Sequence, residues 1–411
     1  MPPPGPFRPT AWRSPLRGPW LTAVLGSVLL VLFTIVAVTG FASHAAYEPG
    51  LPANAIVRDD LPLDIGWPTG PAWLYAVTQG LHVNLGLAAI PVLIVKLWSV
   101  IPRLFAWPPV AAPAQAVERG MVALLVASAG FELATGVANI ANWYPFGFDF
   151  VRMHYYGGVV FVAAFAAHLV VKLPVAVRAF RQRGVLRPLR DATPEPAEAG
   201  GLAPTAPAAP TITRRGVLGL TGAGALLVLV GNAWQSIGGP LREVSFLAPR
   251  RETGDPGEFP VNKTAAAAGV TAAMTGAAWE LVLRADGERR LDRAALLALP
   301  QHTARLPIAC VEGWSTTQEW TGVRLVELAR LAGAADAGEV LVESLQARGV
   351  LRRATLGGAQ LRAADALLAL RVNGADLTPD HGFPARIIVP ALPGVHCTKW
   401  VSTLTFRGRA A

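Results

Sequence analysis

Charged residues and cysteines are both scarce in this chain of 411 residues. Asp, Glu, Lys and Arg make up 15% of the sequence and hydrophobic residues 52%, whereas soluble domains carry roughly 25% charged residues. The shortage of charge excludes an ordinary soluble enzyme, and the apolar content excludes a disordered chain. The two cysteines, Cys310 and Cys397, form no Cys-x-x-Cys pair, which excludes a disulfide scaffold and a zinc finger.

Basic residues outnumber acidic ones, 36 to 27, which gives a formal net charge of +9 and a pI near 10.2. A pI this high is often a sign of nucleic-acid binding. Here, however, Lys and Arg gather in short stretches between apolar runs, as they do in the cytoplasmic loops of membrane proteins. The sequence therefore predicts an integral membrane protein with no nucleic-acid partner.

Five apolar runs are long enough for the roughly 20 residues that cross a bilayer core. They cover 20–47, 66–95, 116–143, 154–171 and 216–241. We expect the first four to form a membrane four-helix bundle, with the fifth as one further transmembrane helix. The first run does not resemble a cleavable signal peptide, because no short apolar region with a small-residue cleavage site follows.

Loop charges orient these helices. The N-terminus, the turn between the second and third runs and the segment after the fourth run are basic: Arg8, Arg13, Arg17, Lys96, Arg103, Arg119, Lys172, Arg178, Arg181, Arg183, Arg187 and Arg190. The loop between the first two runs is acidic: Glu48, Asp59, Asp60 and Asp64. We therefore expect a multi-pass protein of the bacterial cytoplasmic membrane, with its N-terminus inside and its C-terminal domain on the outer face.

The chain divides into four parts by composition. These are a four-helix domain (1–190), a Pro/Ala-rich cytoplasmic linker (191–212), a motif with the fifth helix (213–237) and an extracytoplasmic domain (238–411). The linker composition is typical of a semi-rigid extended spacer. In the last part, strand and helix patterns alternate: strands at 279–287, 340–346 and 385–392, and helices at 291–300 and 323–333. That mixture predicts an α+β domain.

The fifth helix follows Thr-Arg-Arg-Gly-Val-Leu (213–218), which resembles a twin-arginine signal of the pathway that exports folded proteins. Ordinary positive flanking of a membrane helix is the alternative. No evident cleavage site follows the motif, so we expect the helix to remain as an anchor.

Four segments of the last part carry a resemblance. They are EFPVNKTA (258–265), LPIACVEGWS (306–315), HGFPAR (381–386) and GVHCTKW (394–400). Together they resemble the sulfite-oxidase family of molybdenum-cofactor domains, over roughly 250–408. The resemblance implies a molybdopterin-dependent oxidoreductase in which the Cys310 thiolate binds molybdenum. A soft thiolate suits a metal that cycles between Mo(VI) and Mo(IV). The alternative for Cys310 is a buried small hydrophobe.

The same resemblance implies which residues contact the pyranopterin cofactor: Asn262, Lys263, His381, Arg386, Gly394 and Lys399. An arginine can hold phosphate with two hydrogen bonds and a lysine adds a point charge, while glycine lets backbone N–H groups approach. For each basic residue the alternative is a solvated surface charge. We interpret Cys397 as a packing residue.

The resemblance has departures that bear on the substrate. Sulfite-oxidising members carry arginines close behind the cysteine and in the Gly-to-Lys-Trp loop. Here Cys310 is followed by Val-Glu-Gly-Trp-Ser (311–315), and the loop has His396. The Cys-Val-Glu-Gly-Trp-Ser segment looks more like the bacterial periplasmic sulfoxide-reductase branch. We therefore expect oxygen-atom transfer from an S-oxide or N-oxide. The alternative is a sulfite-type dehydrogenase of a sulfur compound that passes electrons to quinone.

The membrane part resembles a four-helix, dihaem-type cytochrome b domain in helix count and histidine placement. A b haem takes two imidazoles from facing helices. We take Lys96 and Lys172 as markers of the same depth in the membrane, near its cytoplasmic boundary. Counted from these lysines at the helical rise per residue, His82 and His154 differ in depth by about 6 Å. They form the expected axial pair. His168 is a candidate for a deeper haem or a quinone site, and His44 is at the wrong end.

A membrane quinol is the expected electron partner of such a haem, and a haem-free anchor is the alternative. Glu132, an acidic residue inside the third run, is either a proton carrier or paired with a group of the fourth helix.

Overall fold

The computed structural model describes residues 5–47, 66–108, 110–191, 193–197, 201–248 and 259–408. They fall into two compact units. The first comprises Met1–Val38, His82–Asn139 and Trp143–Gly231, and the second comprises Thr39–Leu81, Ile140–Asn142 and Asn232–Ala411. The acidic loop expected between the first two apolar runs lies outside the described residues.

Five helices are long and apolar enough to cross a membrane, as predicted. They are α1 (Pro19–Ala46), α2 (Leu74–Leu104), α3 (Pro113–Ile140), α4 (Phe150–Arg183) and α5 (Arg214–Ile237). Helix α4 extends beyond its uncharged run because basic residues are good helix formers. It ends at Gly184, whose N–H donates to the Phe180 carbonyl.

The first unit has one apolar core cluster, which draws on α1 to α4. Its buried members are Leu16, Trp20, Leu21, Leu25, Leu29, Phe33, Ala89, Val92, Ala129 and Phe161. The ring of Phe33 lies edge-on to those of Phe161 and Phe165 on α4. Val217, Leu218 and Ala225 of α5 pack against the same cluster. The fifth helix therefore shares its core with the other four.

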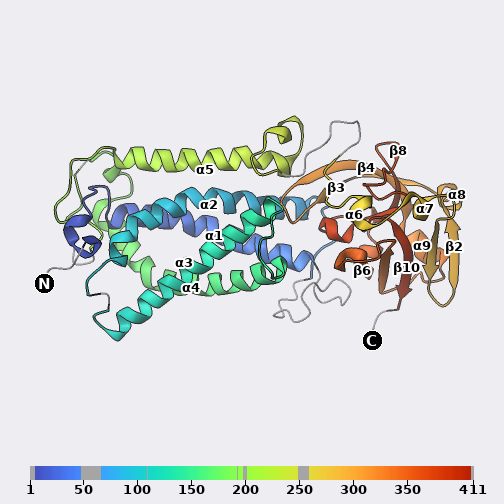
Figure 1. Cartoon of the computed structure of the whole chain (residues 1–411), viewed down its shortest axis with the longest axis horizontal. Helices are drawn as coiled ribbons and strands as arrows, with labels where there is room; N and C mark the ends of the chain where they lie inside the picture. Colours follow the sequence, from blue (N-terminus) through green and yellow to red (C-terminus); the bar gives the residue numbers. More distant parts are fainter. Residues whose placement is uncertain are drawn as a thin grey trace. The chain divides into compact units, whose positions relative to one another are not determined.

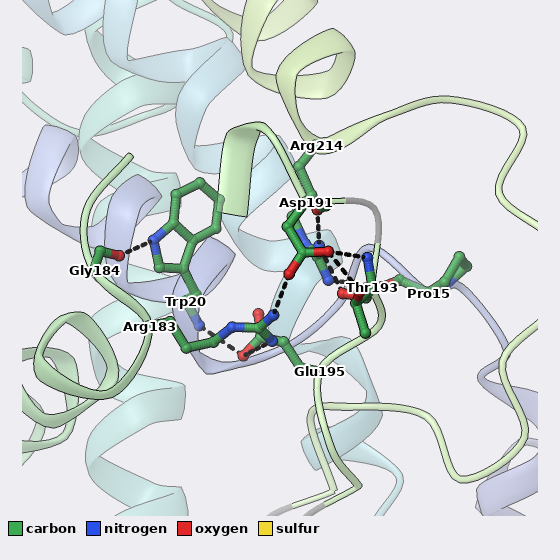
Figure 2. Close-up of polar contacts among 8 residues, drawn as sticks. All are labelled: Pro15, Trp20, Arg183, Gly184, Asp191, Thr193, Glu195 and Arg214. Atoms are coloured by element: carbon green, nitrogen blue, oxygen red, sulfur yellow. Dashed lines mark hydrogen bonds and ion pairs between the residues drawn. The ribbon is translucent and has the colours of Figure 1, made fainter. Parts of the chain in front are cut away.

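A buried carboxylate of the linker lies at the start of α1 (Figure 2). Glu195 is 5% exposed and accepts a hydrogen bond from the Trp20 backbone N–H at 3.2 Å. Its Oε2 atom is 3.9 Å from Nη1 of Arg183, and the Trp20 indole donates to the Gly184 carbonyl at 3.0 Å. A carboxylate at a helix N-terminus is stabilised by the helix dipole. The linker therefore contributes an N-terminal cap to α1.

The two arginines of the twin-arginine-like motif differ in environment. Arg214 is buried, and its guanidinium donates to the carbonyls of Asp191, Thr193 and Pro15 (Figure 2), whereas Arg215 is exposed. The described residues of 191–212 contain no helix or strand, yet Arg214 fastens their first part to the N-terminal segment.

The second unit contains two five-stranded sheets (Figure 1). One has the order β2-β1-β10-β5-β6, with β1 and β10 parallel and the other neighbours antiparallel. Its strands are β1 (Glu280–Arg284), β2 (Glu288–Asp292), β5 (Glu339–Ser344), β6 (Arg353–Gly357) and β10 (Val401–Arg407).

The other sheet has the order β3-β4-β7-β8, with β9 also paired to β7. Its strands are β3 (His302–Ala309), β4 (Ser315–Arg324), β7 (Leu367–Val372), β8 (Ala375–Asp376) and β9 (Arg386–Ile388). Short helices connect the strands: η4 (Pro240–Val244), α6 (Ala265–Ala268), α7 (Ala272–Thr275), α8 (Arg293–Ala298), α9 (Leu325–Leu331), α10 (Gly358–Leu361), η5 (Val350–Arg352) and η6 (Gly394–His396). The expected mixed α+β character is confirmed.

A close approach of two backbones joins β4 to β7 at Gly322. A Cβ atom at this position would lie 2.0 Å from the Leu368 carbonyl oxygen and 2.7 Å from the Ala369 Cα. Backbone atoms cannot move aside as a flexible side chain can, so only glycine fits here.

We therefore expect Gly322→Ala to destabilise the C-terminal domain by roughly 1–3 kcal/mol or more, the cost of overpacking a close-packed interior. Thermal unfolding of the purified protein, followed by circular dichroism, measures the effect. Gly287→Ala is the matched control, because a Cβ there meets nothing within 4 Å. Equal melting temperatures for the two variants would contradict this account of the β4–β7 contact.

Candidate functional site

Cys310 begins the turn between β3 and β4. The turn, residues 310–314, closes on itself through two backbone hydrogen bonds: Cys310 N–H donates to the Trp314 carbonyl and Gly313 N–H to the Cys310 carbonyl, both at 2.9 Å. Gly313 has φ +94°, a conformation that favours glycine. The Cys310 side chain is 5% exposed. The antiparallel hairpin thus presents one nearly buried thiol in a fixed place.

An amide lies directly on that thiol. Asn262 Nδ2 is 3.1 Å from Cys310 Sγ, a distance at which the N–H donates to sulfur. Hydrogen bonds to the charged form of a group favour that form, and the thiolate is the form that binds metals. The structure therefore brings together the predicted ligand and one of the predicted cofactor-contacting residues.

Lys399 ties together two further segments of the resemblance. Its ammonium donates to the carbonyls of Lys263 and Asp380, the latter at 2.8 Å. Lys263 in turn donates to Gln346 Oε1 at 2.9 Å. Both predicted lysines thus lie beside Asn262, and neither is a freely solvated surface charge.

Arg386 is a buried cation. It is 7% exposed, its Nη1 donates to the His381 carbonyl at 3.2 Å, and its Nε has no hydrogen-bond partner among the described residues. Burial disfavours the charged form and lowers the pKa of Arg386 to about 10. The side chain remains charged at neutral pH, so this charge is a cost to folding unless an anion compensates it.

His381 is held at both ring nitrogens. Its Nε2 lies 2.9 Å from the Phe259 carbonyl and its Nδ1 lies 2.8 Å from the Thr378 hydroxyl. Burial lowers the pKa of His381, which favours a neutral ring that donates through Nε2 and accepts through Nδ1. The ring supports the backbone beside Arg386, because both of its nitrogens already have partners.

Two glycines allow close packing in this region. A Cβ at Gly394 would lie 3.3 Å from the Ala309 carbonyl, next to Cys310. A Cβ at Gly382 would lie 3.1 Å from Lys399 Cβ and 3.3 Å from Arg386 Cβ. Each residue that the resemblance assigns to the cofactor therefore contacts another such residue, or the residue next to one in the sequence.

His396 and Cys397 follow Gly394 and are buried. Burial lowers the pKa of His396 to about 4, so the ring is neutral at neutral pH. Burial also raises the pKa of Cys397, which lies in the same apolar cluster as Cys310. This placement agrees with a packing role for Cys397. Trp314 and Trp400 are also buried.

Two membrane histidines lie face to edge in the first unit. The ring centroids of His82 on α2 and His154 on α4 are 6.1 Å apart, at an interplanar angle of 84°. Iron held at about 2 Å from each of two imidazole nitrogens places the ring centres roughly 6 Å apart. The spacing of this predicted pair therefore suits a single iron.

The hydrogen bonds of the pair leave the same nitrogen on each ring for a metal. His82 Nδ1 lies 2.9 Å from the Val36 carbonyl. His154 Nδ1 lies 2.9 Å from the Thr135 hydroxyl and 3.2 Å from Glu132 Oε2. Histidines that bind metals usually donate their other N–H to a carbonyl or carboxylate in this way. Glu132 is thus paired with a group of the fourth helix, one of its two expected roles.

His168 is not brought to this pair. Its electrostatic neighbours are Lys96, Lys172 and Glu118, and Lys172 is hydrogen-bonded to Glu118. Among the described ring contacts none joins His168 to a second histidine. The role of His168 in a deeper haem or a quinone site remains a prediction.

Sequence reasoning missed several partners of the site. Asp380 accepts from the Ala265 backbone N–H at 2.8 Å, and its position directly before the His-Gly-Phe-Pro motif was an available signal. Gln346 and Thr378 lie outside the motifs, and no sequence feature marks them. Gln79 of α2, a buried amide in an apolar run, donates to the Val311 carbonyl at 2.7 Å. Its polarity inside a predicted membrane helix could have drawn attention to it.

The residues present fit both expected groups. For a molybdenum cofactor there is one thiol with an N–H donor on its sulfur, and a buried guanidinium with an unsatisfied Nε suited to a phosphate. In the described ranges no group of three or more His, Cys, Asp or Glu could hold a metal ion by side chains alone, so a metal here would need ligands from the cofactor itself. For a haem there are two imidazoles that both engage neighbouring groups through Nδ1, so each can offer Nε2 to iron.

Comparison with known proteins finds a family model that matches the C-terminal part. Residues 268–411 match the family model described as the oxidoreductase molybdopterin binding domain. This bears out the oxidoreductase domain and the molybdenum cofactor expected from the sequence.

Three relatives illustrate the similarity. The uncharacterized oxidoreductase YuiH of Bacillus subtilis is 35% identical over 111 residues, 26% of this chain and 54% of that protein. The NADH nitrate reductase of Volvox carteri is 38% identical over 102 residues, 22% of this chain and 12% of that protein. A sulfite oxidase of Arabidopsis thaliana is 44% identical over 50 residues, 12% of this chain and 13% of that protein. The chain thus spans about half or less of the length of these relatives.

Replacing the buried cation Arg386 by methionine should have different effects on the stability of the fold and on the binding of the cofactor. We expect the cofactor-free Arg386→Met protein to melt at the same or a higher temperature, because a buried charge without an anion is removed. We expect its molybdenum content, measured by mass spectrometry of the metal, to fall about tenfold or more through loss of a charged hydrogen bond. Arg371→Met, at an exposed ion pair with Asp376, is the control. Normal molybdenum content in Arg386→Met would remove Arg386 from the cofactor site.

Proposed function

We propose that this protein is a membrane-bound, molybdopterin-dependent oxidoreductase that reduces an S-oxide or N-oxide, with a membrane quinol as electron donor and haem b as electron carrier. The observation that carries the proposal is the Cys310 thiol. It is fixed by a closed turn, receives an N–H from Asn262 and lies within a domain that matches the molybdopterin-binding family. When bound, the molybdenum cofactor supplies two-electron oxygen-atom transfer.

The charge around Cys310 favours a neutral substrate. Sulfite-oxidising members carry an arginine close behind the cysteine, and no arginine occurs here in residues 311–315. The Gly-to-Lys-Trp loop, where those members carry another, has His396, which is neutral at neutral pH and 2% exposed. A small dianion would need cationic partners at such positions to offset its desolvation. Sulfoxides and amine N-oxides carry no net charge, so their binding does not require those cations.

The membrane unit supports an electron carrier. His82 and His154 have the spacing for one iron, and each has its Nδ1 engaged by an acceptor. These hydrogen bonds orient the rings and fix the tautomer that leaves Nε2 as the ligand. The basic segments beside the helices support an orientation with the N-terminus in the cytoplasm. An odd number of crossings then places the molybdopterin domain on the outer face, after export through the twin-arginine pathway.

The second candidate function is oxidation of a sulfur compound with transfer of electrons to quinone. The similarity to a sulfite oxidase and the two cations Arg386 and Lys399 in the site favour it. In this second reaction the same residues would serve electron flow in the opposite direction, from the substrate to quinone. Identifying the substrate distinguishes the two candidate functions.

We expect Cys310→Ser to fold and to lose turnover, because a hydroxyl is a poor replacement for a thiolate ligand. Reduced viologen consumption with methionine sulfoxide or trimethylamine N-oxide measures reduction, and ferricyanide reduction with sulfite measures oxidation. Cys397→Ser, which changes the packing cysteine, should keep most of the activity. Full activity in Cys310→Ser would sink the proposed function, and rapid sulfite oxidation without any turnover of S- or N-oxides would favour the second candidate.

Single changes to the histidine pair should remove the haem and leave the molybdenum. We expect His82→Ala and His154→Ala each to lose the reduced-minus-oxidised b-type band while molybdenum content is unchanged, because the proposed haem is held by both imidazoles as axial ligands. His168→Ala should keep the band of this haem. An unaltered spectrum in His82→Ala, or wild-type protein with molybdenum and no haem at all, would leave a haem-free anchor as the correct description of the membrane unit.

A further inference from the structure

The turn that carries Cys310 is held from outside by three side chains. Gln79 Nε2 donates to the Val311 carbonyl at 2.7 Å, and the Ser236 hydroxyl donates to the Gly313 carbonyl at 2.5 Å. Arg242 Nη2 donates to the Ser315 carbonyl at 3.1 Å. Alternate carbonyls, those of residues 311 and 313 in the turn and of residue 315 at the start of β4, are therefore each bound by a different side chain.

These donors come from the ends of two long apolar helices and the short helix η4. Gln79 lies in the second turn of α2, Ser236 lies at the end of α5, and Arg242 follows in η4. All of them belong to the second compact unit, together with Cys310. None lies within residues 268–411, the part that matches the family model. The domain match therefore assigns them no role.

The two helix ends approach each other closely at the turn. A Cβ on Gly80 of α2 would lie 3.3 Å from Ser236 Cβ on α5. Ser236 also accepts a hydrogen bond in return, from the Ser315 hydroxyl to its carbonyl at 2.5 Å. Ser236 is thus fastened to the turn at two points, and Gly80 leaves the room for it.

A buried amide in an apolar helix is costly unless it is paired. Gln79 is 3% exposed, and its Oε1 has no hydrogen-bond partner among the described residues. An unsatisfied buried polar atom destabilises the folded protein. An apolar side chain at this position would avoid that cost, but it could not bind the Val311 carbonyl. Among the described residues this carbonyl is the hydrogen-bond partner of the Gln79 side chain.

We infer that Gln79 and Ser236 are positioning residues for the Cys310 thiol, so that the ends of the membrane helices complete the molybdenum site. The inference rests on the proposed function. The two backbone bonds that close the turn run from Cys310 N–H to the Trp314 carbonyl and from Gly313 N–H to the Cys310 carbonyl. Neither of them engages the carbonyls of Val311 and Gly313, which Gln79 and Ser236 bind. Fixing these carbonyls fixes the backbone on the C-terminal side of Cys310, and with it the direction of Sγ toward Asn262.

The test compares variants that lack a hydrogen-bond donor to the turn with a control variant of a neighbouring residue. The hydroxyl of that neighbour donates to carbonyls of its own helix. Gln79→Met keeps the side-chain length and removes the donor, and Ser236→Ala removes the hydroxyl. Thr78→Ala is the control, because the Thr78 hydroxyl donates to the Leu74 and Tyr75 carbonyls within α2. If Gln79→Met fails to accumulate, Gln79→Glu replaces the amide donor at equal size and serves in its place.

The first measurement needs no cofactor. Full-length protein is purified from cells unable to make the molybdenum cofactor and treated with iodoacetamide, and alkylation of Cys310 is followed by peptide mass spectrometry, which separates it from Cys397. We expect Cys310 to react about tenfold faster in both donor-deficient variants and at the wild-type rate in Thr78→Ala. Wild-type rates in both variants would overturn the inference.

The second measurement uses the molybdenum-loaded protein. We expect both variants to retain molybdenum, to show a shifted or broadened Mo(V) paramagnetic resonance signal and to lose about tenfold in kcat with KM within twofold of wild type. An unchanged signal and kcat would also overturn the inference. Absence of molybdenum from the wild-type protein would defeat the proposed function instead. Faster alkylation in the variants would then still establish that Gln79 and Ser236 position the thiol.

Discussion

The closure of the 310–314 turn is the constraint on which the rest of the site depends. Two backbone hydrogen bonds within the turn that connects β3 to β4 fix the place of Cys310. The other segments of the site contact this hairpin or a segment bound to it. Asn262 reaches the thiol, Gly394 packs on the carbonyl of Ala309, and Lys399 joins the segments that carry Lys263 and Asp380. The metal ligand that we propose Cys310 to be would have to be held rigidly to set the geometry of its metal, and a hairpin turn meets that need.

Burial leaves one basic side chain of the site charged at neutral pH and another neutral. Arg386 is buried yet retains its charge at neutral pH, with an Nε left without a partner, whereas His396 is buried and neutral. The guanidinium is therefore suited to a permanent anion such as a cofactor phosphate, and the imidazole provides no charge for a substrate. Desolvation has both effects because the ordinary pKa of arginine is so far above neutrality and that of histidine so close to it.

The long apolar helices bring polar side chains to specific partners. In the first unit they bring His82 to His154 and supply each Nδ1 with an acceptor, and in the second unit the ends of α2 and α5 grip the Cys310 turn. Gln79 and His82 lie three residues apart on one helix. At the other end of α5, Arg214 is buried by the linker, and Glu195 caps α1. The polar residues of these apolar helices therefore lie where they have specific partners, as the cost of an unpaired polar group in an apolar medium requires.

The sequence by itself determined the five apolar helices and the α+β character of the last part, because hydropathy runs and alternation are local properties of the chain. A motif also singled out Cys310, whose role as a metal ligand stays a prediction. The sequence also paired His82 with His154, since rise per residue converts sequence position into depth. Only the tertiary structure decided that Gln79, Ser236 and Arg242 hold the Cys310 turn, that Arg214 and Arg215 differ, and that linker residue Glu195 is buried. These contacts join residues far apart in the chain through single hydrogen bonds. Such hydrogen bonds form where two distant segments of backbone approach each other in the folded chain. A local pattern of residue types carries no information about which distant segments meet.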